Sequence, residues 1–294
     1  GLADVNWQSA NDGGSPICAV QAKVTQSVEA EDEVRTTTVG TCHAPVAAGF
    51  RHTCAVVDGD AWCWGKNQYG QVGSDTDGAN VLVPWKVELV PEGVEERDSP
   101  EVTGIAAGAA HTCAVADGEA WCWGRNTYGQ AGTGTNGSMV SPVAAKISEP
   151  VVVTKIAAGY YHTCALTTGG TVWCWGRDHW GQVGEAYRLN DGPVLEPAEV
   201  EIAGSPEVTD IAAGEEHTCA VADGDAWCWG RNTYGAVGTA PWQWYTTPQI
   251  VAIEGSPEVT KIAAGRDHTC AVADGDAWCW GRNEDGQVGT GTEG

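Results

Sequence analysis

A histidine and two cysteines recur at one spacing through most of this chain. The first set is His52, Cys54 and Cys63. The segment HTCAV, or HTCAL in the third copy, begins at residues 52, 111, 162, 217 and 268, and WCWG follows each time. Imidazole and thiolate groups are preferred zinc ligands, so a metal site is one chemistry open to this pattern. A disulfide between the two cysteines is the other.

The spacing of the cysteines favours disulfides. Cys54 and Cys63 are symmetric about Asp58-Gly59, a preferred two-residue hairpin turn. Counting outward from this turn, they form the fourth cross-strand pair, a non-hydrogen-bonded pair with Cα atoms roughly 4.5 Å apart. Directly opposed cysteines need no fourth ligand, so metal is the minor alternative. The pattern predicts Cys54–Cys63, Cys113–Cys122, Cys219–Cys228 and Cys270–Cys279, with Cys164–Cys174 across a turn one residue longer.

The elements that carry these residues form a repeat with a period of 51 to 59 residues. A small-residue run such as Ile105-Ala106-Ala107-Gly108 precedes each histidine, and N-x-x-G-Q-x-G or a close variant follows WCWG. Several short strands separated by glycine-rich turns are typical of one four-stranded propeller blade. We predict an all-β propeller with five clear repeats over residues 46–294. The small residues suit the innermost strand, and both tryptophans of each WCWG should pack between blades.

Composition restricts the partners and the compartment. Acidic residues outnumber basic ones 39 to 15 in 294 residues, and the formal charge is -24. Such a chain repels nucleic acid and anionic membrane surfaces. Twelve cysteines without a CxxC pair indicate an oxidising compartment, so we expect a secreted, extracellular protein, with the periplasm or cell surface as alternatives. No apolar run is long enough for a membrane span.

The repeat HTCAVADGDAWCWGRNxxGQVG resembles that of the regulator-of-chromosome-condensation family, and five matches cover residues 46–294. The resemblance implies a propeller, commonly of about seven blades. Functions in this family range from guanine-nucleotide exchange and chromatin binding to secreted bacterial inhibition of β-lactamases. The cysteine pairs and the acidity depart from the nuclear members. The fold is therefore expected to transfer better than the function.

Residues 1–45 match the repeat poorly. Ile17-Cys18-Ala19-Val20 echoes TCAV, and Cys42 is the expected disulfide partner of Cys18. We expect either a degenerate N-terminal blade, giving six blades with seven as the alternative, or a strand-donating segment. The last copy reaches Gly294 without the proline-containing strand of the others. An unpaired strand edge invites pairing with another segment. The N-terminal segment could close its own ring, or it could fill the edge of a neighbour and give a homo-oligomer or a head-to-tail filament.

Candidate binding residues are sought where the copies differ, because packing explains what the copies share. Two variable pairs recur, one just before each histidine and one after WCWG. Aromatic residues in loops on one propeller face are typical interface anchors. The candidates for partner binding are Tyr160, Tyr161, Trp180, Tyr234, Trp242, Trp244 and Tyr245. The alternative interpretation is aromatic caps over blade edges.

No catalytic motif is present, so no catalytic residues and no cofactor are predicted. The acidic segment Asp75-Thr76-Asp77-Gly78 keeps calcium as a minor alternative, although it lacks the spaced ligands of a recognised loop. The leading hypothesis is a non-catalytic extracellular structural or interaction propeller that assembles through its termini. A secreted protein-binding module or inhibitor that uses one loop face is the second hypothesis. An enzyme with a central-channel site is disfavoured, because Ala/Gly-rich inner strands supply few reactive groups.

Overall fold

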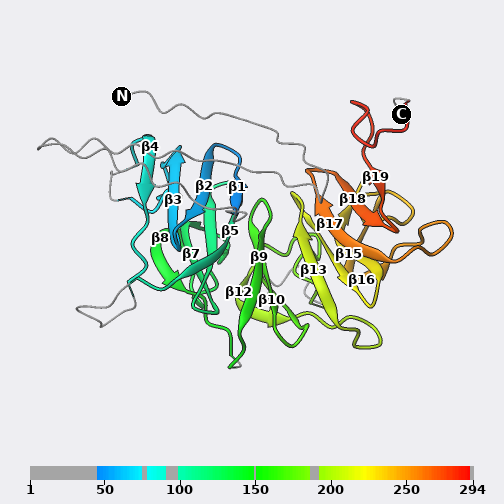
Figure 1. Cartoon of the computed structure of the whole chain (residues 1–294), viewed down its shortest axis with the longest axis horizontal. Coiled ribbons are helices and arrows are strands. Elements are labelled where there is room, and N and C mark those ends of the chain that lie inside the picture. The colour runs from blue at the N-terminus through cyan, green and yellow to red at the C-terminus, as the bar shows by residue number, and fades with distance from the viewer. Residues whose placement is uncertain (1–44, 75–77, 91–98, 149, 186–191, 292–294) are drawn as a thin grey trace, which may run out of the picture.

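A computed structural model describes residues 45–74, 78–90, 99–148, 150–185 and 192–291. All regular structure in these ranges is β-strand, arranged as five antiparallel sheets. The sheets follow one another in chain order from β1–β4 on the left of Figure 1 to β17–β19 on the right. The innermost strands β1, β5, β9, β13 and β17 contact one another in sequence. Successive sheets of this kind are propeller blades, as predicted.

Four of the sheets have four strands and the last has three among the described residues. The first holds β1 (Val46–Ala48), β2 (His52–Val57), β3 (Asp60–Gly65) and β4 (Val81–Lys86). The second holds β5 (Val102–Ala107), β6 (His111–Ala116), β7 (Glu119–Asn126) and β8 (Gly137–Ala144). The third holds β9 (Val153–Ala158), β10 (His162–Thr167), β11 (Val172–Gly176) and β12 (Val194–Glu199). The fourth holds β13 (Val208–Ala213), β14 (His217–Ala222), β15 (Asp225–Asn232) and β16 (Gln243–Ile250). The fifth holds β17 (Val259–Ala264), β18 (His268–Ala273) and β19 (Asp276–Gly281).

The hairpins confirm the predicted disulfides. Asp58 and Gly59 both have positive φ, 52° and 79°, as a type I′ turn requires. In the β2–β3 ladder Cys54 lies directly opposite Cys63, and the corresponding pairs occupy the same place in the other four sheets. All five disulfides form with Cα atoms 4.1 Å apart. Cys18 and Cys42 lie outside the described residues, as do residues 1–44, so the sixth blade stays a prediction.

A repeated hydrogen-bond chain joins each sheet to the next. The Thr218 hydroxyl donates to the Gln182 carbonyl at 2.8 Å, so it accepts the Nε2–H of His162 at 2.9 Å. The Trp229 indole donates to the same Gln182 carbonyl at 3.0 Å. The histidine of one sheet and the second tryptophan of the next therefore fasten the two sheets together. The other histidine–threonine pairs are His52–Thr112, His111–Thr163 and His217–Thr269.

These contacts decide the role of the repeated histidines. Burial lowers the pKa of His111 and His162 to about 3 and that of His52 and His217 to about 4, so the rings are neutral at physiological pH. Because the cysteines are disulfide-bonded and the imidazoles bond to threonine, the metal alternative does not describe these sets. The interpretation of the histidines as hydrogen-bonded structural residues is confirmed for His52, His111, His162 and His217.

The tryptophans follow the prediction only in part. Trp123, Trp175 and Trp229, the second of their pairs, are completely buried between sheets. The first tryptophan of each pair is less uniform, since Trp121 is buried whereas Trp278 is 36% exposed. Position along the chain explains this difference. The strand β18 is also less buried than its counterpart β10, because the fifth sheet has a described neighbour on one side only.

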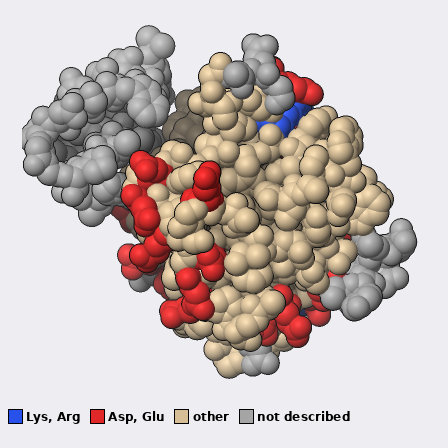
Figure 2. Space-filling model, turned by 90° about the vertical axis from the view of Figure 1, so that its right-hand side faces the viewer, with Lys and Arg blue, Asp and Glu red and all other residues tan. Residues whose placement is uncertain are grey.

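The chain's negative charge is repeated on one end of the blades. The turns after the second strands carry Asp58 with Asp60, Asp117 with Glu119, Asp223 with Asp225, and Asp274 with Asp276. Figure 2 looks at the side of the molecule that carries β17–β19, where Asp and Glu gather along one border and Lys and Arg show at few points. Basic side chains are therefore scarce on this side of the molecule.

Candidate protein-binding face

One end of the blades collects nearly all the candidate aromatic residues. In an antiparallel blade, the loop after the first strand and the loop after the third strand lie at the same end. We call this end the aromatic face. It consists of residues 49–51, 108–110, 159–161, 214–216 and 265–267 with residues 66–74, 78–80, 125–136, 177–185, 231–244 and 282–291, so that it includes the first two residues of β16.

The first group of rings on the aromatic face centres on Tyr160 and Tyr161. Their rings meet edge to face with centroids 4.5 Å apart. Tyr128 of the second blade lies 5.1 Å from Tyr161, and Phe50 of the first blade lies 6.0 Å from Tyr160. Phe50 is 65% exposed. Aromatic side chains from three blades thus form one continuous surface, in which the Tyr160–Tyr161 pair has the edge-to-face geometry that such rings prefer and the other two pairs are tilted.

The second group of rings lies toward the fourth blade. Trp180 contacts Trp244 at 5.8 Å between ring centroids, and Tyr234 contacts Trp242 at 6.3 Å. Trp242 is 75% exposed and Trp244 is 50% exposed. Tyr245 differs from the other candidates, because it packs partly against a core cluster and its hydroxyl donates to Gln243. The structure therefore brings six candidates to the exposed face and gives Tyr245 a mainly structural position.

Arginines outside the predicted set of binding residues join these rings. Arg177 lies over Tyr128 and Tyr161, with its Cζ 5.6 and 5.9 Å from the centroids, and Arg231 lies 5.6 Å over Trp180. Each follows a WCWG segment, so the repeat itself was a signal for them. Guanidinium groups stacked on aromatic rings are well-attested cation–π contacts.

Carboxylates neutralise the arginines in the third to fifth blades. Glu216 accepts from Arg177 at 2.7 Å and from Arg231 at 3.0 Å. Glu215 accepts from Arg266 at 2.6 Å. Arg282 pairs with Glu284 and lies 3.7 Å from Asp267. We call this set the paired region, because each of its arginines has a carboxylate partner.

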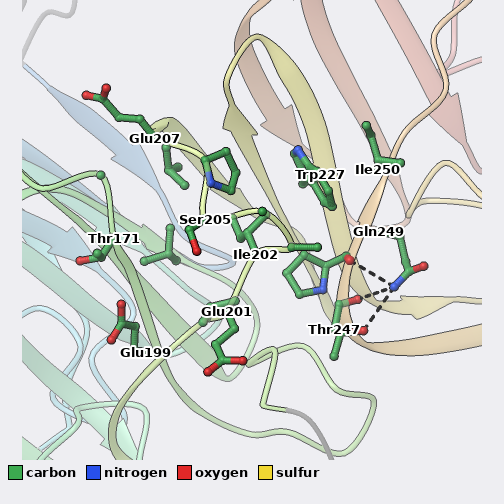
Figure 3. Close-up of a pocket in the computed structure, with 18 of the residues that line it drawn as sticks. Thr171, Glu199, Glu201, Ile202, Ser205, Glu207, Trp227, Thr247, Gln249 and Ile250 are labelled. Carbon is green, nitrogen blue, oxygen red and sulfur yellow. Dashed lines mark hydrogen bonds between the residues drawn. The ribbon is translucent and has the colours of Figure 1, made fainter.

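A groove opens at the end of the blades opposite the aromatic face, between the third and fourth sheets (Figure 3). Its volume is about 1120 Å³, and Trp227, Ile202 and Ile250 line it together with Glu199, Glu201 and Glu207. Gln249 donates to the carbonyls of Thr247 and Pro248 along one wall. None of the sequence candidates lines this groove, and nothing in the repeat pattern marks it. Its titratable lining side chains are three glutamates.

The described residues contain no cluster of three or more His, Cys, Asp or Glu that could hold a metal ion. Asp75, Thr76 and Asp77, the segment considered for calcium, lie outside the described ranges. No helix that could cross a bilayer occurs in the part of the chain that the structure describes.

Comparison with known proteins extends these findings. The family model for the RCC1-like domain matches residues 16–294. The chain is 30% identical over 251 residues to the ultraviolet-B receptor UVR8 of Arabidopsis thaliana, an alignment that covers 84% of this chain and 54% of the relative. It therefore spans about half the length of that curated relative.

Two solved structures show the same architecture. The crystal structure of human WBSCR16 superposes with a TM-score of 0.71 at 20% identity, covering 95% of this chain and 69% of that one. Yeast RCC1 (Prp20), solved with Kap60 bound, superposes with a TM-score of 0.64 at 26% identity, covering 81% of this chain and 55% of that one. The likeness to WBSCR16 concerns the fold alone.

Proposed function

The chain belongs to the RCC1-like domain family, and on this basis we propose that it is a non-catalytic, extracellular propeller that binds a protein partner through its aromatic face. The observation that carries the proposal is the pair of aromatic groups on this face, Phe50 with Tyr160 and Tyr161 and Trp180 with Trp244, stacked with arginines from neighbouring blades. A secreted inhibitor is one form that such a protein-binding module takes.

The composition of the aromatic face supports a protein partner. Trp, Tyr and Arg are the residue types that most often dominate binding energy at protein interfaces. Trp242 and Trp244 keep half or more of their surface exposed. Large apolar side chains that are exposed together are typical of interaction sites and not of core packing. Yeast RCC1 (Prp20) is itself solved in complex with the protein Kap60. A net charge of -24 disfavours nucleic acid.

The disulfides support an extracellular location. Five are formed in the described residues, one in each sheet. Disulfides persist in oxidising compartments and are rare in the reducing cytosol. Each closes a short hairpin loop, so we attribute to them resistance of each blade to unravelling and proteolysis outside the cell.

Panning a phage library of random 12-residue peptides on the immobilised chain tests the proposal. Peptides enriched on the unmodified protein should be lost when Tyr160, Tyr161 and Trp180 are replaced by alanine together. The matched control replaces Leu82 and Trp85, exposed on the outer strand β4, and should retain the peptides. Circular dichroism establishes that both variants fold. Equal enrichment on the triple variant would contradict the proposed face.

Self-assembly by strand exchange is the second candidate function. Its support is the fifth sheet, which has three strands among the described residues where the others have four. An unpaired edge can accept a strand from another chain. Light scattering under non-reducing conditions distinguishes a monomer from an assembly. A mass of 30.7 kDa at all protein concentrations would contradict assembly.

A further inference from the structure

The aromatic face is hollowed between its first three blades. The hollow has a volume of about 230 Å³, and Ala109 and Ala110 lie at the position that precedes the histidine. Every other blade carries larger side chains there: Phe50 and Arg51, Tyr160 and Tyr161, Glu215 and Glu216, Arg266 and Asp267. The hollow therefore exists because the second blade has two methyl groups in place of two large side chains. We call it the basic pocket.

The charge of the basic pocket is opposite to that of the chain. Arg51, Lys66 and Arg125 line it, and its lining includes no carboxylate. None of these three cations forms an ion pair within the described ranges, whereas the arginines of the paired region all do. The chain has 15 basic residues against 39 acidic ones, so three cations around one hollow, none paired with a described carboxylate, are a local concentration of positive charge.

The guanidinium of Arg125 is held in place without being neutralised. Its Cζ lies 4.9 Å from the Tyr69 ring centroid and 5.0 Å from that of Tyr161. Nε donates to the Thr127 hydroxyl at 3.1 Å, and Nη1 donates to the Tyr161 hydroxyl at 3.3 Å. Burial raises the pKa of Tyr161, so this hydroxyl remains neutral. These contacts use two of the five guanidinium N–H groups and orient the planar group for a carboxylate.

We propose that the basic pocket binds a short acidic motif of a protein partner, with a carboxylate on Arg125 and an adjacent side chain against Phe50 and Tyr160. This assignment rests on the proposed function and names the chemistry of the partner. Small-molecule sites usually measure about 300 Å³ or more, so a hollow of about 230 Å³ suits side chains of a peptide better than a free metabolite.

The proposed ligand is a short motif because the net negative charge of this protein repels a long acidic ligand. Repulsion from the net charge acts on a long polyanion along its whole length. At physiological ionic strength charges are screened beyond about 8 Å, so one or two carboxylates within the pocket respond mainly to Arg51, Lys66 and Arg125. A local acidic motif is therefore attracted where an extended polyanion is repelled.

Isothermal titration calorimetry with synthetic peptides tests this proposal. The probe is a nine-residue peptide in which one tyrosine and three neighbouring glutamates are embedded in glycine and serine. The control peptide has glutamine in place of each glutamate. The acidic peptide should bind at least about tenfold more tightly than the control. Arg125→Gln should lower its affinity about tenfold or more, because the oriented guanidinium is lost. Arg282→Gln removes the same charge from the paired region and should change it less than about twofold.

Four results would overturn the assignment. They are equal binding of the acidic and glutamine peptides, equal losses from the two arginine variants, full displacement by inorganic phosphate at millimolar concentration, and self-association that Arg125→Gln abolishes. The last two would identify a free anion or a second copy as the occupant. Failure of the proposed function would be seen separately in the phage experiment, if no enriched peptide were lost when Tyr160, Tyr161 and Trp180 are replaced. Enriched peptides without acidic residues would contradict only the pocket assignment.

Discussion

The basic pocket and the paired region occupy the same face and use the same repeat positions, yet their arginines have different surroundings. Arg125 of the second blade faces Ala110 in its own blade and the Tyr161 hydroxyl in the next. Arg231 of the fourth blade faces Glu216, at the position that corresponds to Ala110, and Arg177 reaches the same carboxylate from the third blade. The residue that immediately precedes the histidine, in the arginine's own blade or in the next one, thus decides whether the arginine is neutralised within the chain or left available to a ligand.

The comparison shows how a repeat protein acquires a site without altering its framework. Histidine, threonine and tryptophan join neighbouring blades in the same way beneath both regions. The backbone that carries the loops is therefore equivalent. Variation is confined to side chains that project from this framework, where exchange costs little stability.

Acid should produce the largest effect, because protonation of the buried histidines destabilises the blade contacts beneath both regions at once. The pKa values of His52, His111, His162 and His217 are lowered to about 3 to 4 in the folded state, so the unfolded chain binds more protons below pH 6.5. Stability is full above about pH 6.5 and falls as the pH drops toward 4, by up to about 1.4 kcal/mol per pH unit for each histidine. Thermal unfolding followed by circular dichroism at pH 7, 5 and 4 measures this loss.

The control for the acid experiment is His111→Gln, which removes one titrating group and keeps an amide that can donate to Thr163. Its stability should depend less steeply on pH than that of the unmodified protein. Equal pH dependence of the two proteins would contradict the contribution of this histidine.

Ala110→Glu should convert the basic pocket into a copy of the paired region. The new carboxylate occupies the position of Glu216 and pairs with Arg125, so affinity for the acidic peptide should fall about tenfold or more. Ala203→Glu adds the same charge beside the groove at the other end of the blades and serves as the control. Titration calorimetry of both variants measures the effect. Unchanged affinity in Ala110→Glu would show that Arg125 is not the anion-binding group.

Glu216→Ala is the opposite exchange. It leaves Arg177 and Arg231 without their shared carboxylate and should lower the free energy of unfolding by about 1 kcal/mol, since both arginines are partly exposed. The released arginines should add a second, weaker binding event for the acidic peptide. Denaturant unfolding and the stoichiometry from calorimetry measure the two effects. A stoichiometry that stays at one would show that a free arginine without a hollow does not bind the peptide.

Tyr161→Phe should have the smallest effect. The substitution removes the hydroxyl that accepts from Arg125 but keeps the ring beneath the guanidinium. Peptide affinity should fall roughly two- to threefold, as expected for loss of one orienting hydrogen bond. Tyr245→Phe removes a hydroxyl bonded to Gln243, remote from the pocket, and should leave affinity unchanged. A larger loss in Tyr245→Phe than in Tyr161→Phe would contradict the positioning role.

Much of the fold could be predicted because it is encoded locally. An Asp-Gly turn fixes which residues face each other a few positions away, so Cys54 and Cys63 could be paired by counting along the chain. The candidate site was predicted in part. The variable positions led to Tyr160, Tyr161 and Trp180, whereas Arg125 and Lys66 were overlooked because a basic residue follows WCWG in every blade.

The sequence by itself determined the strands, the disulfide register and the family, because each depends on a pattern within one repeat. Only the tertiary structure decided which arginines are paired. Arg125 and Tyr161 are 36 residues apart, and Arg177 and Glu216 are 39 apart, so these contacts arise only when neighbouring blades pack side by side. The loss of two large side chains at Ala109 and Ala110 likewise becomes a hollow only when the first and third blades enclose it.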